Sequence, residues 1–243
     1  MEKTLKLAII GYGKMGQEIE KLAPTEGYRV EVIIDQPDHW QKYHDQLKEM
    51  DVAVEFTTPQ AVAGNLKKLM DMGVPVVTGT TGWMDQLQEI STYCTKSNGS
   101  VFYASNFSIG VNLFFAINRY LARIMSDYPE YKPTLEEIHH TRKLDAPSGT
   151  ALTMIREIIE QNPGLKGWKF ADEHPSENEV GVTAHRIDDV TGTHTMSYSS
   201  DIDLIRIQHI AHNRKGFARG ALLAARWLHN KKGIFTMNDL LKL

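Results

Sequence analysis

The residues most suited to chemistry lie close together in the middle of the chain. Two adjacent histidines, His139 and His140, are followed by Lys143 and then by the sequence Ser148–Thr150. Histidine exchanges a proton near neutral pH, and a nearby lysine adds a full positive charge. This combination favours proton transfer to an anionic substrate.

The Ser-Gly-Thr sequence predicts an anion site at a helix start. Ser148 is a typical cap, and the exposed N–H groups of Gly149 and Thr150, with the helix dipole, favour a carboxylate. Adjacent strand residues face opposite sides, so His139 and His140 share a direction only if the strand has ended. A purely structural role, with each ring satisfied by a backbone carbonyl, is the alternative. No HxxxH or HExxH spacing is present, so we predict no metal site.

A glycine-rich loop near the start of the chain predicts dinucleotide binding. The loop follows an apolar run, precedes a helix-compatible segment, and consists of Gly11, Tyr12, Gly13, Lys14, Met15 and Gly16. Its glycines permit a tight turn, close approach to a pyrophosphate and close helix packing. Asp35 stands where an acid accepts from the ribose hydroxyls, which favours NADH, but Lys14 offsets its charge and leaves NADPH open. A glycine turn without a ligand is the alternative.

Two further polar segments follow apolar runs in the same half of the chain. They are Gly79, Thr80, Thr81 and Gly82, and then Ala104, Ser105, Asn106 and Phe107. Ligands of open parallel sheets bind beyond the carboxyl ends of the strands, so we expect these segments to line the nicotinamide side of a cleft. Taken alone, the Gly-Thr-Thr-Gly sequence also fits an ordinary polar turn.

The elements that position these residues fall into two groups. The first half alternates short strands with helices, which predicts a parallel, Rossmann-type α/β sheet. Its predicted strands are 5–10, 28–34, 52–56, 74–78 and 101–104, and its helices are 14–23, 60–72 and 83–96. The second half predicts an α+β domain with a mixed sheet. Its predicted helices are 110–127, 150–161 and 216–230, its strands are 135–141, 180–187, 193–200 and 203–210, and its likeliest mobile loop is 162–178.

Composition narrows the functional class. The chain has 243 residues, of which 42% are hydrophobic, and a net charge of −3. No apolar stretch approaches the roughly 18 residues that span a bilayer, and no long basic run is present. We therefore expect a cytoplasmic protein with neither nucleic acid nor membrane as a partner. Cys94, the single cysteine, is expected to be an ordinary packed thiol.

The sequence resembles the dihydrodipicolinate reductase family of lysine and diaminopimelate biosynthesis. The His-His-x-x-Lys-x-Asp-Ala-Pro-Ser-Gly-Thr-Ala string is highly specific for that family. The resembling segments are 11–16, 56–59, 79–82, 105–112, 137–151 and 212–221, in the family's order. The segment between Asp35 and Asp51 is short, which indicates a compact form.

The resemblance implies reduction of 4-hydroxy-tetrahydrodipicolinate, a small cyclic dicarboxylate, by NADH or NADPH with loss of water. By motif position, His139 is a proton donor or acceptor and Lys143 a proton donor, while the substrate-binding residues are His140, Ser148, Gly149 and Thr150. The cofactor positions are Gly11 to Gly16, Asp35, Gly79 to Thr81 and Ala104 to Phe107. The resemblance also implies a homotetramer and domains at 1–108 and 109–215, with the helix of 216–243 returning to the dinucleotide domain.

Two rival classes share part of this pattern. Another two-domain nicotinamide-dependent dehydrogenase would keep the glycine loop but has no need of the Lys143 to Thr150 string. A non-catalytic dinucleotide-binding regulator would have no reason to hold a proton donor beside an anion site.

Overall fold

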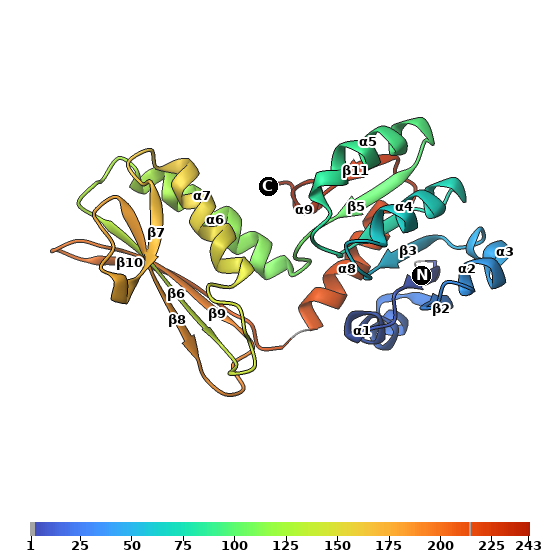
Figure 1. Cartoon of the computed structure of the whole chain (residues 1–243), viewed down its shortest axis with the longest axis horizontal. Helices are drawn as coiled ribbons and strands as arrows, with labels where there is room; N and C mark the ends of the chain where they lie inside the picture. The colour runs from blue at the N-terminus through green and yellow to red at the C-terminus, as the bar shows by residue number, and fades with distance from the viewer. Residues whose placement is uncertain (1–2, 214) are drawn as a thin grey trace. The chain divides into compact units, whose positions relative to one another are not determined.

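The computed structural model describes residues 3–213 and 215–243. The chain forms two compact units, of which the first runs to Ile109 and resumes at Lys215, and the second begins at Gly110. Each unit has its own β-sheet and its own hydrophobic core (Figure 1).

The first unit contains a parallel sheet of six strands. Their order across the sheet is β11-β5-β4-β3-β1-β2, and every neighbouring pair is parallel. The strands are β1 (Leu5–Ile10), β2 (Tyr28–Ile34), β3 (Val52–Glu55), β4 (Val76–Thr78), β5 (Ser100–Tyr103) and β11 (Gly233–Phe235). The predicted Rossmann-type sheet is confirmed.

Helices cover both faces of this sheet. Successive side chains along each strand point to opposite faces, so each strand contributes to two hydrophobic cores. Leu7 and Ile9 join the core formed with α1 and α8, whereas Ala8 and Ile10 join the core formed with α4 and α5. The helices are α1 (Lys14–Leu22), α2 (His39–Lys42), α3 (His44–Leu47), α4 (Val62–Asp71), α5 (Leu87–Lys96), α8 (Lys215–Leu228) and α9 (Met237–Leu241).

Helix α8 packs closely against the first unit. Tyr28 donates its hydroxyl to the Leu222 carbonyl at 2.7 Å, and Arg226 donates to the Gly27 carbonyl at 3.0 Å. Gly220 lies very close to the loop that follows β5. A Cβ on Gly220 would stand 1.9 Å from the Phe107 carbonyl oxygen. Beyond the predicted helix, the chain adds β11 at the sheet edge and α9, neither of which the sequence analysis predicted.

The second unit contains a mixed sheet with the order β10-β9-β6-β8-β7. Its elements are α6 (Ile109–Met125), β6 (Lys132–His139), α7 (Gly149–Gln161), β7 (Gly167–Phe170), β8 (Glu179–Arg186), β9 (Thr193–Ser199) and β10 (Leu204–Ile210). Strand β6 pairs parallel with β8 and antiparallel with β9. Helices α6 and α7 lie side by side and share a core with one face of this sheet (Figure 1). The predicted mixed α+β fold is confirmed.

Two details were not predicted by the sequence analysis. Strands β8 and β9 follow one another in the chain but are not paired, because β6 lies between them. Part of the segment predicted as a mobile loop is the edge strand β7, whose Trp168 and Phe170 pack against the core. In the described part of the chain, no helix has both the length and the apolar character needed to cross a membrane.

Because Gly220 lies so close to Phe107, we predict that adding a single methyl group at residue 220 strongly reduces the stability of the fold. Gly220→Ala should lower the free energy of unfolding by about 2 kcal/mol or more, because α8 must move away from a backbone carbonyl. Gly64→Ala in α4 is the control, since a Cβ there has no neighbour within 4 Å, and it should stabilise by roughly 0.5–1 kcal/mol. Thermal denaturation of both variants measures the difference; equal effects would contradict the packing argument.

Candidate active site

The alternation of strand β6 brings the polar residues of the site to one face. Leu135, Glu137 and His139 are buried on that face, two residues apart. Glu137 stands directly opposite His194 of β9, and His139 stands opposite Arg186 of β8. At the carboxyl end of β6, the face of the sheet that is otherwise apolar and buried therefore carries a cluster of polar side chains.

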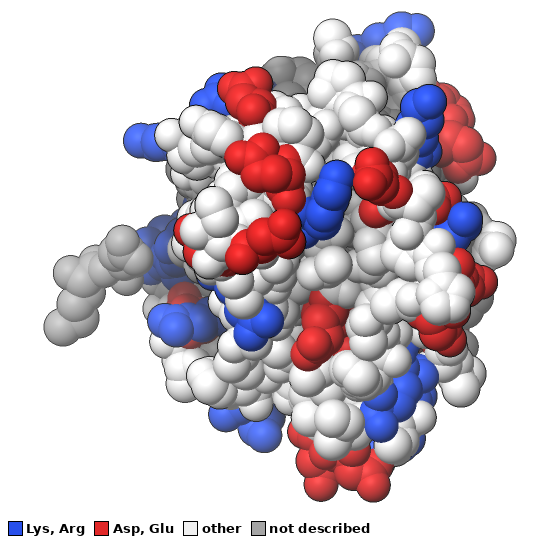
Figure 2. Space-filling model, turned by 90° about the vertical axis from the view of Figure 1, so that its left-hand side faces the viewer, with Lys and Arg blue, Asp and Glu red and all other residues white. Residues whose placement is uncertain are grey.

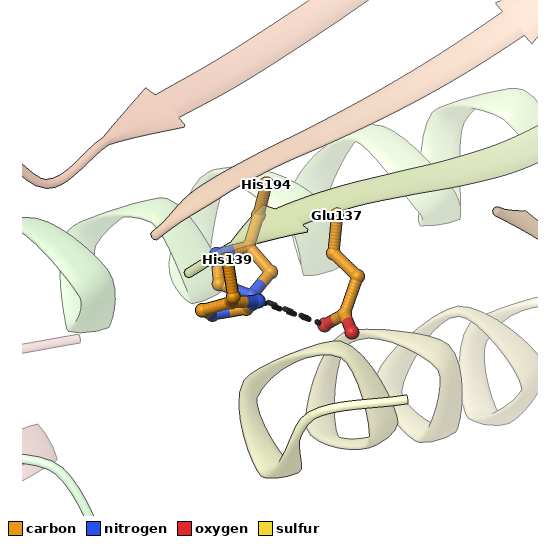
Figure 3. Close-up of side chains that lie close together, drawn as sticks. All are labelled: Glu137, His139 and His194. Carbon is orange, nitrogen blue, oxygen red and sulfur yellow. Dashed lines mark ion pairs between the residues drawn. The ribbon is translucent and has the colours of Figure 1, made fainter. Parts of the chain in front are cut away.

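Three side chains of this cluster converge on one point (Figure 3). Glu137 Oε2 lies 3.7 Å from His139 Nδ1 and 3.7 Å from His194 Nε2. The two imidazole rings pack edge to face with centroids 5.0 Å apart. Within the described residues, His139 Nδ1 is buried without a hydrogen-bond partner. That nitrogen faces the Glu137 carboxylate at a distance slightly too long for a hydrogen bond.

Glu137 is a buried ion with several partners. The Ser148 N–H donates to both of its oxygens, at 3.2 and 3.0 Å, and Arg186 Nη2 lies 3.2 Å from Oε1. Burial alone would raise the pKa of Glu137, but the nearby His194, the hydrogen bonds from Ser148 and the interaction with His139 lower that pKa to about 2. The carboxylate is consequently negative at neutral pH.

His139 is held neutral in this environment. Burial lowers the pKa of His139 to about 4, against the opposing attraction of Glu137. The positive charges of Lys143 and Arg186, together with the neighbouring His194, add to the lowering of this pKa. At neutral pH the imidazole has a lone pair on one nitrogen and a proton on the other.

The start of α7 has the structure that the sequence analysis predicted. Ser148 is the cap, and its hydroxyl accepts from the Ala151 N–H at 3.2 Å. The same hydroxyl lies 3.1 Å from His194 Nε2. Helix geometry leaves the N–H groups of Gly149 and Thr150 without intrahelical acceptors, and a Cβ on Gly149 would meet nothing within 4 Å. These two N–H groups are the ones suited to a carboxylate.

Lys143 lies in the loop between β6 and α7. Its ammonium contacts both oxygens of Asp145, at 2.7 and 2.8 Å, which lowers the pKa of Asp145. Arg186 holds this loop by donating to the carbonyls of Lys143, at 3.3 Å, and Asp145, at 2.6 Å. His140 is half-buried just after the end of β6.

The clustered ligand atoms of Glu137, His139 and His194 lie within 4.8 Å of one another, as in some metal sites. Sequence spacing did not reveal the complete group because His194 comes from β9, whereas Glu137 and His139 come from β6. Arg186 and the Ser148 N–H already compensate the carboxylate. The group therefore has the character of a hydrogen-bonded ion network, which a further cation would disturb.

In the first unit, the glycine loop has the shape that its sequence requires. Gly11 has a φ of +89°, and a Cβ there would stand 2.2 Å from the Phe56 carbonyl oxygen. A Cβ on Gly16 would stand 2.3 Å from the Gly11 carbonyl oxygen, but one on Gly13 would meet nothing within 4 Å. Gly11 and Gly16 thus allow tight packing, whereas Gly13 leaves open space beside the backbone.

Asp35 lies beside this loop. Its Oδ1 accepts from the Tyr12 N–H at 3.0 Å, and the Gly11 N–H donates to the Ile34 carbonyl at 2.7 Å. Lys14 and Met15 begin helix α1, with Lys14 exposed and Met15 packed against the core. The structure therefore brings the predicted acid and the predicted glycine loop together.

The loop after β4 is fixed by a buried carboxyl group that the sequence analysis did not assign. Glu55, at the end of β3, accepts from the Thr78 hydroxyl at 2.6 Å and from the Thr80 hydroxyl at 2.8 Å. Gly79 lies against the Phe56 ring, and Thr81 is exposed. An acid inside the apolar run of 52–56 was the signal that could have revealed this contact.

The segment after β5 divides between surface and core. Ser105 is exposed, and the Asn106 side chain accepts from the Ser108 N–H at 2.9 Å. The Phe107 ring is buried against Phe102, with ring centroids 5.9 Å apart. The side chain of Phe107, one of the predicted cofactor residues, therefore packs in the hydrophobic core.

Sequence reasoning assigned no role to Glu137, His194 or Arg186. The i, i+2 spacing of Glu137 and His139 on a strand was a usable signal, because it places both on one face. His194 and Arg186 follow only from the strand register.

Comparison with known proteins gives matches along nearly the whole chain. Residues 5–107 match the model for the N-terminal domain of dihydrodipicolinate reductase, and residues 110–241 match the model for its C-terminal domain. The 4-hydroxy-tetrahydrodipicolinate reductase of Christiangramia forsetii is 43% identical over 98% of each chain. The enzyme of the same name from Methanocaldococcus jannaschii is 34% identical over 98% of each chain.

Solved structures show the same fold. The dipicolinate-bound dihydrodipicolinate reductase of Paenisporosarcina sp. TG-14 matches with a TM-score of 0.76 at 22% identity, covering 96% of this chain and 97% of that one. An amine dehydrogenase of Mycobacterium smegmatis matches with a TM-score of 0.57 at 7% identity, covering 96% and 95%.

The parallel sheet with its glycine loop, followed in the chain by a mixed-sheet domain with a buried histidine–carboxylate cluster, is the arrangement of a two-domain NAD(P)H-dependent oxidoreductase. Within that class, the two domain matches and the 43% identity are decisive. The chain belongs to the dihydrodipicolinate reductase family, as its motifs predicted.

The lowered pKa of His139 predicts a pH dependence of stability. In the unfolded chain His139 binds a proton below its ordinary pKa of 6.5, whereas in the folded chain it does so only below about 4. The stability that neutral His139 contributes is therefore present above pH 6.5 and is lost as the pH falls through 4. Between pH 6.5 and 4, the free energy of unfolding should fall by about 3 kcal/mol less in His139→Gln than in the parent protein. Urea unfolding at pH values from 8 to 4 measures it, and parallel curves for the two proteins would contradict the assignment.

Proposed function

We propose that this protein reduces 4-hydroxy-tetrahydrodipicolinate to tetrahydrodipicolinate with NADH or NADPH, in lysine and diaminopimelate biosynthesis. One observation supports this above others. A cluster that combines a buried histidine, a lysine and an open helix start lies in a chain that also has a dinucleotide-type glycine loop. Family membership supports the same reaction.

A cyclic dicarboxylate suits the groups at the start of α7. The Lys143 ammonium, which pairs with Asp145 in the free protein, can pair with a substrate carboxylate in its place. The N–H groups of Gly149 and Thr150 can receive a carboxylate, with His140 as a further donor. Ser148 contributes by capping the helix, since its hydroxyl and N–H already have partners within the protein.

Proton transfer falls to His139 and Lys143. A bound nicotinamide cofactor supplies hydride, and the protein must therefore deliver a proton to the substrate ring. Lys143 is positively charged and can donate one. A bound dicarboxylate adds negative charge near His139, which raises the pKa of that histidine and favours its proton-donating form.

The cofactor residues are those of the three loops at the carboxyl ends of β1, β4 and β5. The open space beside Gly13 fits a pyrophosphate, and Asp35 fits the ribose hydroxyls. We place the cofactor against Gly11 to Gly16, Asp35, Gly79 to Thr81 and Ala104 to Phe107. We further propose that NADH is preferred, because the Asp35 carboxylate repels a 2′-phosphate.

We also propose a cytoplasmic homotetramer that binds neither nucleic acid nor membrane. Strand β10 and the turn before it expose apolar side chains, namely Ile202 (91% exposed), Leu204, Ile205 and Ile210. Exposed apolar side chains concentrated on an edge strand are typical of an interface between subunits. Acidic and basic side chains are intermixed on the face drawn in Figure 2, so that face offers polyanions no continuous basic surface.

The proposed reaction predicts substrate-dependent turnover. The purified protein should oxidise NADH or NADPH only when the cyclic dicarboxylate, generated enzymatically, is supplied. Loss of nicotinamide absorbance measures the rate. No substrate-dependent loss with either cofactor would overturn the proposed function.

Two variants separate the roles in that assay. His139→Gln should lower kcat by at least roughly 10²-fold with a modest change in KM, because a proton donor acts mainly in the transition state. Lys143→Ala should raise KM and lower kcat together, since Lys143 also binds a carboxylate. Near-normal kcat in His139→Gln would assign the proton to another group.

The position of Asp35 predicts the cofactor preference. Asp35→Ala should lower KM for NADPH relative to NADH by roughly tenfold, because it removes a like-charge repulsion of about 1 kcal/mol or more. Asp38→Ala removes an exposed acid three residues away and serves as the control. Steady-state kinetics with both cofactors give the ratio, and an unchanged ratio in Asp35→Ala means that Asp35 does not read the ribose.

A further inference from the structure

The buried carboxylate of Glu137 has no part in the roles assigned so far. Its side chain is fully buried, and its contacts are the Ser148 N–H, Arg186 and the two histidines His139 and His194. Keeping an ion in the interior costs free energy even when it is compensated. The burial of a carboxylate beside the candidate proton-transfer group therefore indicates that the carboxylate has a function there.

The two nitrogens of His139 have different surroundings. Nδ1 faces Glu137 Oε2 at 3.7 Å (Figure 3). Nε2 lies beside Gly192, where a Cβ would stand 3.2 Å from that nitrogen. The absence of a side chain at residue 192 leaves room at the Nε2 edge, whereas the Nδ1 edge is enclosed.

From this geometry we infer that Glu137 and His194 are positioning residues for His139. They hold the neutral ring as the tautomer with its proton on Nδ1, directed to the Glu137 carboxylate, and they leave the Nε2 lone pair for exchange with substrate. The proton-exchange part of this inference rests on the proposed function; the tautomer does not.

Electrostatics supports this tautomer over the other. A lone pair on Nδ1 would face the negative carboxylate, whereas an N–H there is attracted to it. The carboxylate also stabilises the imidazolium that forms when Nε2 takes up a proton. Lys143, Arg186 and His194, the other charged or titratable groups that act on this ring, all oppose that uptake. Glu137 is thus the group that makes protonation of His139 accessible.

His194 fixes the direction of both partners. Its ring packs edge to face on that of His139, and its Nε2 lies between the Ser148 hydroxyl, at 3.1 Å, and Glu137 Oε2, at 3.7 Å. Since Ser148 also caps α7, one carboxylate anchors both the candidate proton-transfer ring and the candidate carboxylate-binding helix start. A displacement of Glu137 would misalign the two together.

Nuclear magnetic resonance of the full chain with 15N-labelled histidine tests the tautomer directly. The His139 signal is assigned by its loss in His139→Gln. At neutral pH the parent protein should show the Nδ1–H form, and Glu137→Gln should shift the ring toward the Nε2–H form. Glu136→Gln, at the neighbouring exposed position on the opposite face of β6, is the matched control and should leave the signal unchanged.

Kinetics of the same proteins tests the positioning role. Glu137→Gln should lower kcat by roughly 10- to 100-fold, the range known for groups that orient a metal-bound imidazole, with a smaller rise in KM because the same carboxylate holds the start of α7. Glu137→Asp should restore part of the loss, and Glu136→Gln should behave as the parent. Gly192→Ala leaves the Glu137 carboxylate in place but crowds His139 Nε2, so this variant should also lower kcat. It provides the kinetic test of the inference if Glu137→Gln fails to fold.

The outcomes distinguish this inference from the proposed function. An Nε2–H ring in the parent protein, or an unchanged tautomer in Glu137→Gln, overturns the inference. If Glu137→Gln does not fold, normal kcat in Gly192→Ala overturns it. Absence of turnover in the parent protein, with the expected tautomers observed, overturns the proposed function and leaves the tautomer assignment standing.

Discussion

The candidate active site depends on the burial of one negative charge. Glu137 lies at 0% exposure between two sheet strands and the start of α7. Such a charge persists only when several groups compensate it, and here these are an N–H, a guanidinium and two imidazoles. The need to satisfy this ion fixes the cap of α7, the loop held by Arg186 and the setting of His139.

A related arrangement occurs in the first unit. The Glu55 carboxyl group, at the carboxyl end of β3, accepts from hydroxyl groups of the loops that follow β3 and β4. In both units, therefore, a buried acid at the end of a central strand anchors loops that the proposed function uses. Loops carry few internal contacts, so an anchor of this kind gives them a defined position while the strands supply the rigid frame.

The buried ion also explains how a neutral histidine can serve in proton transfer. Burial and the neighbouring positive groups disfavour the imidazolium, and Glu137 opposes them. A negatively charged substrate shifts the same balance further toward protonation. In the proposed function, the proton-donating state of His139 is thereby linked to the presence of substrate, so that a proton is not released beforehand.

The sequence by itself determined the fold class, the family and the local motifs. Alternating apolar runs required a sheet with helices on both faces, the glycine loop required its tight turn, and Ser148 was recognisable as a cap because capping is a contact between residues three apart. Only the tertiary structure decided that Glu137 meets His194 and that His139 meets Arg186. Those pairs depend on the register of β6 against β8 and β9, and β9 is separated from β6 by more than fifty residues, so no local spacing encodes them. Strand β7 escaped prediction for the same reason, since a short edge strand forms only when a neighbouring strand supplies its hydrogen bonds.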